Sequence, residues 1–295
     1  MFSQKNQTKW GYLFIAPGII GLVLFNLGPM LFSFLISFTQ WDIVTAPVFL
    51  GLDNYHSLIS SSLVLKSLKV TLTYTMITVP MVTIGPLLVA QLLNSKIKGM
   101  SIFRTIFYIP SIVPMVANAA IWTYMYNPMY GPLNSLLKMA DLPALKYIHS
   151  TTQVLPSLAV LAVWLSGNTV IIYLARLQDM PVYLYEAASL DGAGSFAKMK
   201  NITLPFMSPI IFFNLIMAVL GSMQTFTQAY IMTGGGPANS SLMYTMLVYN
   251  NAFKQSKMGY AAAMSWLLFL IMGVITLLVF ASSKRWVFDG NEEEK

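Results

Sequence analysis

The sequence contains no cysteine, and Asp, Glu, Lys and Arg together make up only 9% of its 295 residues. Without cysteine, disulfide bonds and thiolate metal sites are excluded. The dipeptide Gly-Lys is also absent, which excludes a phosphate-binding loop of the G-x-x-x-x-G-K-[ST] kind. The two histidines, His56 and His149, are isolated and have no ligand spacing around them. We therefore predict no metal site and, since no nucleophile–base pairing occurs, no catalytic residues.

Charge is missing from long stretches of a chain that is 56% hydrophobic, which excludes an ordinary soluble domain. A membrane-spanning helix needs about 20 apolar residues. A charge at its centre costs about 2.5–3.5 kcal/mol on insertion scales. The sequence thus predicts an all-α membrane protein with six transmembrane helices in a single domain. The expected spans are residues 11–38, 70–93, 105–126, 154–175, 206–232 and 258–282.

Orientation follows from lysine and arginine, which are enriched on the cytoplasmic side of membrane proteins. With the amino terminus inside, eleven of these residues fall in cytoplasmic segments and six in outer ones. Both termini are therefore expected in the cytoplasm. The net charge of +7 is interpreted as a topology signal, because no basic stripe with interleaved aromatics indicates nucleic-acid binding. The first apolar segment is too long for a signal peptide and lacks its cleavage site, so we expect it to be retained.

The segment 177–205 lies between two predicted spans, and its residues 186–205 form a long polar interruption of the apolar sequence. Pro181 suits the first turn of a helix, and Gly192 suits a left-handed helix end. A second short helix is expected to begin at Ser195 and to end before Pro205. The first helix is apolar nearly all round, yet ten residues span only about 15 Å and cannot cross a membrane. From the residues alone, either a protein partner covers it or it rests on lipid head groups.

The spacing of this segment resembles a known motif. Glu186-Ala187-Ala188 is followed by Gly192, nine residues and Ile202-x-Leu204-Pro205. This pattern is similar to the cytoplasmic EAA loop in permease subunits of bacterial ATP-binding-cassette (ABC) importers. The resemblance implies the type I importer permease fold, and it implies that an ATPase subunit holds this loop. It assigns the coupling contact to Glu186, Ala187, Ala188, Asp191 and Gly192, although Asp191 alternatively only ends the helix.

Two further motifs resemble the same family. Residues 233–239 (TGGGPAN) and 258–263 (MGYAAA) look like segments of the maltose-F or lactose-F type of sugar-importer permease. The resemblance implies a second homologous permease, two ATP-binding subunits that bind ATP and Mg, and an extracellular substrate-binding protein. No cofactor is implied in this chain. The binding protein is expected to face the turn formed by Gly234, Gly235, Gly236 and Pro237.

Polar residues within the spans are candidates for a translocation pathway, because such side chains usually face a cavity or the bundle interior. A sugar site would combine amides or hydroxyls with aromatic rings. The alternative for each residue is hydrogen bonding between helices or contact with a partner permease. Gln224 and Gln228 are expected to share one helix face. The candidates are Asn118, Trp122, Tyr126, Asn168, Gln224, Thr227, Gln228 and Tyr230.

We therefore expect the transmembrane subunit of an ATP-driven carbohydrate importer, a multi-pass protein of the bacterial plasma membrane. An importer for glycerol-phosphate or a polyol is the alternative within the family. A secondary carrier is the alternative outside it, but the spans lack the ionisable residues that ion coupling requires. A membrane-embedded hydrolase would need a catalytic constellation, and the sequence offers none.

Overall fold

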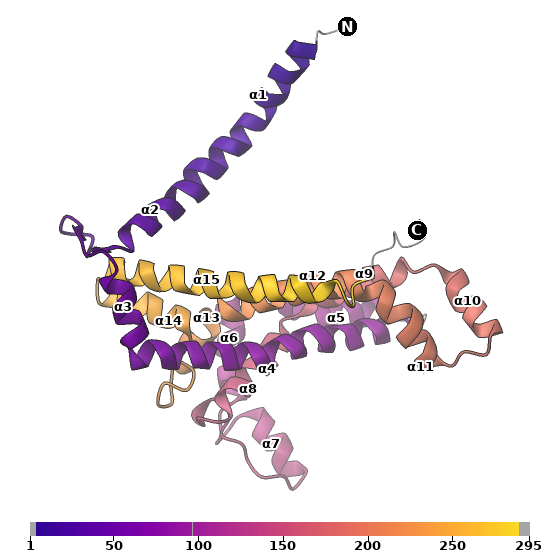
Figure 1. The fold of residues 1–295 in the computed structure, drawn as a ribbon. Coiled ribbons are helices and arrows are strands. Elements are labelled where there is room, and N and C mark those ends of the chain that lie inside the picture. The colour runs from indigo at the N-terminus through magenta and orange to yellow at the C-terminus, as the bar shows by residue number, and fades with distance from the viewer. Residues whose placement is uncertain (1–3, 96, 289–295) are drawn as a thin grey trace. The chain divides into compact units, whose positions relative to one another are not determined.

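The computed structural model describes residues 4–95 and 97–288 and is mostly helical there (Figure 1). Two short strands occur among these residues, β1 (Thr39–Gln40) and β2 (Val48–Phe49), which pair as an antiparallel hairpin. The described residues divide into two compact units. One is drawn from Met1–Ser62 and Val248–Leu270, and the other from Leu63–Leu247 and Ile271–Lys295.

The first unit begins with a long apolar rod. Residues Trp10–Ile36 are continuous and apolar enough to cross a membrane, and the apolar window is not buried against the rest of the chain. The rod contains a π-helical turn directly before Gly28-Pro29, where the Gly28 N–H bonds to the carbonyl of Val23. A wider turn gives room to a proline ring, which would clash with the carbonyl four residues earlier. The elements are α1 (Gln4–Leu22), η1 (Val23–Leu27), α2 (Gly28–Ile36), the β1–β2 hairpin, α3 (Asp53–Ser60), η4 (Asn250–Lys254) and the first part of α15 (Met258–Ser283).

The start of α15 packs directly against the hairpin. The Met258 N–H donates to the carbonyl of Trp41 at 2.8 Å. A Cβ on Gly259 would lie 1.8 Å from the Thr39 carbonyl oxygen, so only glycine fits this contact. Asn54 of α3 holds the same turn, because its Nδ2 donates to the carbonyls of Ser37 and Thr39, both at 2.9 Å. The small residues of the 258–263 motif therefore allow a close approach of backbone segments.

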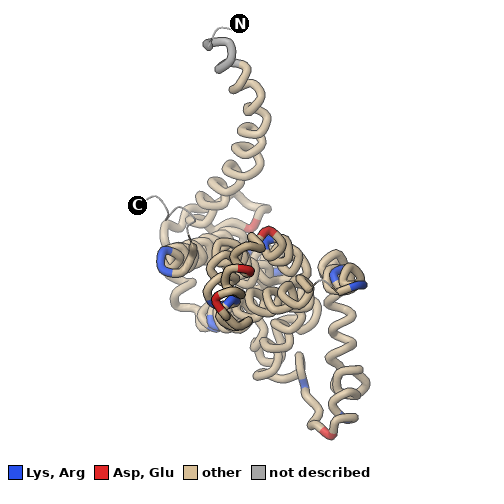
Figure 2. Tube along the Cα trace, turned by 90° about the vertical axis from the view of Figure 1, so that its right-hand side faces the viewer, with Lys and Arg blue, Asp and Glu red and all other residues tan. Residues whose placement is uncertain are grey.

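The second unit holds the remaining helices. They are α4 (Ser62–Leu93), α5 (Met100–Ile112), α6 (Met115–Met125), α7 (Pro132–Met139), η2 (Tyr147–His149), α8 (Val154–Trp164), α9 (Gly167–Gln178), α10 (Val182–Leu190), α11 (Ser195–Lys198), η3 (Met199–Thr203), α12 (Leu204–Met223), α13 (Thr227–Thr233) and α14 (Tyr244–Tyr249). Charged residues of the described chain lie at the ends of the long helices and in connections, which leaves the apolar helix interiors uncharged (Figure 2).

In the described part of the chain, four helices are long and apolar enough to cross a membrane, or up to six if each bent helix pair is one span. The stretch expected to be one helix at 105–126 is broken at Val113-Pro114, and α5 and α6 meet at 102°. Val113 has the extended backbone that a following proline favours. The stretch at 154–175 bends by 50° between α8 and α9. There a Cβ on Gly167 would lie 2.6 Å from the Phe107 carbonyl, so the break lets α9 approach α5 closely.

The fifth stretch also differs from expectation. It was expected to be one helix over 206–232, but α12 ends at Met223 and α13 begins at Thr227. At the break, Phe226 adopts φ −133° and ψ −64°, outside the helical region. The break follows Gly221 and polar residues, and Thr225 turns its hydroxyl back to the Gly221 carbonyl at 3.3 Å. Such side-chain bonds compete with the helix ladder. Gln224 and Gln228 therefore lie on different elements, and the prediction that they share one helix face is wrong.

Candidate functional site

The helical hairpin formed by α10 and α11 contains the EAA residues. Pro181 precedes α10 with an extended backbone, and the helix begins at Val182. Gly192 adopts φ +74°, the left-handed conformation expected of it. The Ala193 N–H then reaches back to the Ala188 carbonyl at 2.9 Å, which satisfies one of the last carbonyls of the helix. This backbone geometry turns the chain sharply between α10 and α11.

One side of the hairpin is apolar and exposed. No residue of α10 is buried. Leu190 is 89% exposed and Phe196, on α11, is 81% exposed, while Val182 and Tyr183 are exposed beside them. Glu186 and Ala187 are exposed too, and among the described residues Glu186 has no ion-pair partner. Large apolar side chains left in water in this way mark a surface that binds something else.

The other side of the hairpin is fixed to the membrane helices. The Tyr185 hydroxyl lies 2.7 Å from Thr203 Oγ1, and Thr203 is buried. Lys198 Nζ donates to Ser189 Oγ at 2.7 Å, which joins α11 to α10. Tyr185 and Ile202 also pack against a cluster of buried residues from α4, α9 and α12. The hairpin is therefore braced against the helix core by a hydrogen bond and by apolar packing.

The helix after the hairpin does not stop before Pro205, so that expectation is wrong. Residues Ser195–Met223 form one continuous helical rod. Its π-helical turn, η3, directly precedes Leu204-Pro205, and the Leu204 N–H bonds to the Met199 carbonyl. This is the same arrangement as the turn before Pro29, and the wider turn accommodates the proline ring. The helical backbone is therefore continuous from α11 through η3 into α12.

A cation reinforces this connection. The Arg176 guanidinium lies 3.8 Å from the centroid of the Phe206 ring, and its Nη2 donates to the Phe206 carbonyl at 3.4 Å. A cation over an aromatic face is stabilised by the ring quadrupole. Arg176 thus links the end of α9 to the first turns of α12. Sequence reasoning missed Arg176, Tyr185, Thr203 and Phe206, because their contacts join residues 18 to 30 positions apart.

The candidate pathway side chains on α6 and directly after it make contacts within the chain. Asn118 Nδ2 donates to the carbonyls of Pro110 and Val113 at 3.2 and 3.0 Å, which satisfies backbone groups freed at the α5–α6 break. The Tyr126 hydroxyl donates to the Ser157 carbonyl at 2.7 Å. The Trp122 ring packs against Tyr126 and edge-on against Trp164, with centroids 5.1 and 5.9 Å apart. In this arrangement these three side chains join helices.

The candidates on α12 and α13 divide into two groups. Gln228 is buried, and its Nε2 lies 2.5 Å from the Tyr74 hydroxyl on α4. Gln224 is exposed, as is Asn168 on α9. Thr227 and Tyr230 are half-buried, and the Tyr230 ring stacks on Phe226 with a centroid distance of 5.1 Å. Among the eight candidates, Asn168 and Gln224 therefore present the most accessible polar groups.

Polar residues of α4 form a buried stripe that sequence reasoning missed. Thr75 Oγ1 accepts a bond from Ser222 Oγ at 3.1 Å, and Thr71 Oγ1 accepts the Tyr244 N–H at 2.8 Å. These polar residues fall on one face of α4, and their three- and four-residue spacing in the sequence indicates that shared face. The stripe consists of Ser67, Thr71, Tyr74, Thr75 and Thr78.

The glycine-rich turn after α13 is held in place by side chains. Gly234 and Gly235 have φ of +57° and +92°, which glycine adopts without strain. Ser241 Oγ donates to the Gly236 carbonyl at 2.6 Å, and Lys66 Nζ donates to the Ala238 carbonyl at 2.7 Å. This network ties the turn to the start of α4.

No group of three or more His, Cys, Asp or Glu residues that could hold a metal ion is present in the part of the chain that the structure describes. Taken together, several apolar spans and a short, braced helical hairpin define the chain as a multi-pass membrane protein. A family profile described as "Binding-protein-dependent transport system inner membrane component" matches residues 43–287. The chain belongs to this family, whose members are transport components and not enzymes.

Known relatives are similar in sequence to this chain along nearly its whole length. The probable ABC transporter permease protein YesP of Bacillus subtilis (strain 168) is 40% identical to this chain. The similarity covers 99% of this chain and 96% of YesP. The multiple sugar-binding transport system permease protein MsmF of Streptococcus mutans is 32% identical, over 94% of this chain and 96% of MsmF. The trehalose/maltose transport system permease protein MalF of Thermococcus litoralis is 31% identical, with 92% of both chains covered.

A solved structure shares the fold. It is described as a bacterial ABC transporter involved in the import of the acidic polysaccharide alginate. The TM-score is 0.81 and the identity 22%, over 95% of this chain and 96% of the other. The fold is therefore that of an ABC importer permease, an inner-membrane component that works with a binding protein.

Proposed function

We propose that this chain is the transmembrane subunit of an ATP-driven importer of carbohydrate, and that it forms half of the translocation pathway as a single membrane domain. The observation that carries the proposal is the α10–α11 hairpin, whose outer face is exposed and apolar while its inner face is braced to α12. Relatives named for multiple sugars and for trehalose and maltose support carbohydrate as the substrate class.

The hairpin couples this chain to an ATPase. Glu186, Ala187, Ala188, Asp191 and Gly192 form the contact, and nucleotide-driven motion passes through the Tyr185–Thr203 bond into α12. The assembly contains a second permease, two subunits that bind ATP and Mg, and an extracellular binding protein that meets the turn at Gly234–Pro237. Both termini then lie in the cytoplasm with the hairpin.

The pathway residues are those whose polar groups remain available. Asn168 and Gln224 are exposed on otherwise apolar helices, which supports contact with sugar hydroxyls or with the second permease. Thr227 and Tyr230 lie on α13, the helix that follows Gln224 in the sequence. Glycerol-phosphate or polyol transport uses the same architecture and remains the alternative substrate class.

The proposal is tested by reversing the charge on the exposed coupling helix. Glu186→Arg is expected to abolish substrate uptake while membrane insertion stays intact, because Glu186 is exposed and has no ion-pair partner among the described residues. Uptake of labelled oligosaccharides and ATP hydrolysis are measured in proteoliposomes that contain the full importer. Asp141→Arg, the same charge reversal on the exposed connection after α7, is the matched control and should transport normally. Normal uptake by the Glu186 variant would remove the docking role.

A further inference from the structure

We propose that a cleft between the first turns of α12 and the C-terminal end of α15 binds the phosphate group of an anionic phospholipid. This site is distinct from the coupling surface and from the sugar pathway, and it goes beyond the proposed function. The cleft has a volume of about 540 Å³. It is lined by three cations, Lys200, Lys284 and Arg285, together with Ser208, Trp286 and Phe288.

The three cations are concentrated without compensation. All are exposed, and none has an ion-pair or side-chain hydrogen-bond partner among the residues that the structure describes. Among the described residues that line the cleft, none is Asp or Glu. Three like charges around one concave surface repel one another unless an anion lies between them. A phosphate group supplies that anion, and Arg285 can bind two of its oxygens at once.

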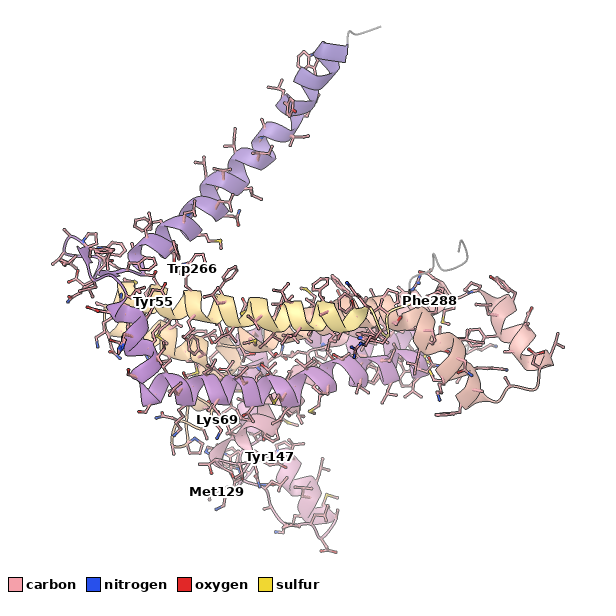
Figure 3. The ribbon with its side chains drawn as sticks, in the orientation of Figure 1. Tyr55, Lys69, Met129, Tyr147, Trp266 and Phe288 are labelled. Atoms are coloured by element: carbon pink, nitrogen blue, oxygen red, sulfur yellow. The ribbon has the colours of Figure 1, made fainter. Side chains whose placement is uncertain are left out.

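The cleft lies where two apolar spans end, which is the depth of a lipid head group. α15 ends at Ser283, directly before Lys284 and Arg285, and the span that contains α12 passes the cleft at Leu204 and Ser208. Phe288, which is labelled in Figure 3, lines the cleft, and its N–H donates to Ser208 Oγ at 2.7 Å. The Trp286 ring packs edge-on against Phe212 at 5.9 Å. Tryptophan is typical of the membrane–water interface.

The apolar part of the lining favours a lipid over a free anion. Leu204, Pro205 and Ile211 line the cleft beside the cations. These side chains offer nothing to inorganic phosphate but can contact the glycerol backbone and the first methylenes of a phospholipid. Basic clefts between membrane helices are known sites for anionic head groups. A lipid bound here would join the end of α15 to Lys200, which lies within the segment that follows the coupling hairpin.

The test counts lipids bound to the full chain purified in mild detergent. The protein is mixed with phosphatidylglycerol, with phosphatidylcholine or with inorganic phosphate, and bound lipid is measured by native mass spectrometry. Wild type is expected to retain phosphatidylglycerol and not phosphatidylcholine, and millimolar inorganic phosphate should not displace it. The triple variant K200Q/K284Q/R285Q is expected to lose about tenfold or more of the phosphatidylglycerol affinity. The matched control is K69Q/K138Q/K146Q, which removes the same charge from exposed lysines elsewhere.

Several results would overturn the proposal. Equal phosphatidylglycerol retention by the cleft variant and the control means that the cations do not form the site. Displacement by inorganic phosphate assigns the cleft to a free anion. If the cleft variant does not fold, the wild-type protein alone still tests the proposal. Equal binding of phosphatidylglycerol and phosphatidylcholine by the wild-type protein would contradict it. The variant K200R/K284R/R285K keeps the charge and should restore retention. Because no transport is measured, failure here is separate from failure of the proposed function.

Discussion

At the residue scale, the contact between Tyr185 and Thr203 is a hydrogen bond that joins α10 of the exposed hairpin to the segment leading into α12. Tyr185→Phe removes the hydroxyl and keeps the ring in the apolar cluster. We expect a loss of about 1 kcal/mol in stability, the net value of one hydrogen bond. We also expect less substrate transported per ATP hydrolysed, because the connection between α10 and Thr203 is weakened. Thermal unfolding and the transport-to-hydrolysis ratio measure the two effects.

Tyr130→Phe is the matched control, since it makes the same change at a side chain that is 65% exposed and lies outside the hairpin. It should leave the unfolding temperature and the ratio unchanged. If the two variants behave alike, the Tyr185 hydroxyl has no special role in coupling.

Gln224 and Gln228 are chemically identical and only four positions apart, yet the structure gives them different surroundings. Gln228→Leu breaks the buried bond to Tyr74 and is expected to cost about 1 kcal/mol of stability. Gln224→Leu is expected to preserve stability and to lower sugar uptake, because its exposed amide is a candidate for the pathway. Thermal unfolding and uptake by both variants check this. Unchanged uptake by the Gln224 variant would remove it from the pathway.

At the element scale, the spans could be predicted and their interruptions could not. Stretches without charge mark the apolar helices, because a charge in the bilayer is costly. The breaks at Val113-Pro114, Leu165-Ser166 and Gln224–Phe226 contain no charged residue, so the charge pattern that marks the spans does not reveal them. The second break depends on the close approach of Gly167 to Phe107, a contact between residues 60 positions apart that no local pattern encodes.

The packing of α15 on the β1–β2 hairpin leads to an element-scale prediction. Gly259→Ala is expected to destabilise the first unit by about 1–3 kcal/mol, because the new methyl group collides with the Thr39 carbonyl. Gly273→Ala, on the same helix, has open space around the added Cβ and should cost nothing. Thermal unfolding of the two purified variants distinguishes them. Equal unfolding temperatures would contradict the close contact.

At the scale of the whole molecule, the sequence predicts which segment couples to an ATPase, but it does not predict how that segment is connected to the membrane helices. The Glu186–Gly192 spacing indicated an EAA loop, and family membership makes the chain a transport component. The rod that runs unbroken from Ser195 through Pro205 depends on a π-helical turn, which a proline in the sequence does not predict. That rod allows a motion of the hairpin to reach the membrane core.

The central claim is that the α10–α11 hairpin lies in the cytoplasm with its apolar side open to an ATPase. Because the chain contains no cysteine, Leu190→Cys introduces a single thiol at a position that is 89% exposed. The measurement is labelling of this thiol by a membrane-impermeant maleimide. We predict no labelling in intact cells, rapid labelling in inside-out vesicles stripped of peripheral subunits, and protection when the ATPase is present. Labelling of the thiol in intact cells would contradict the account.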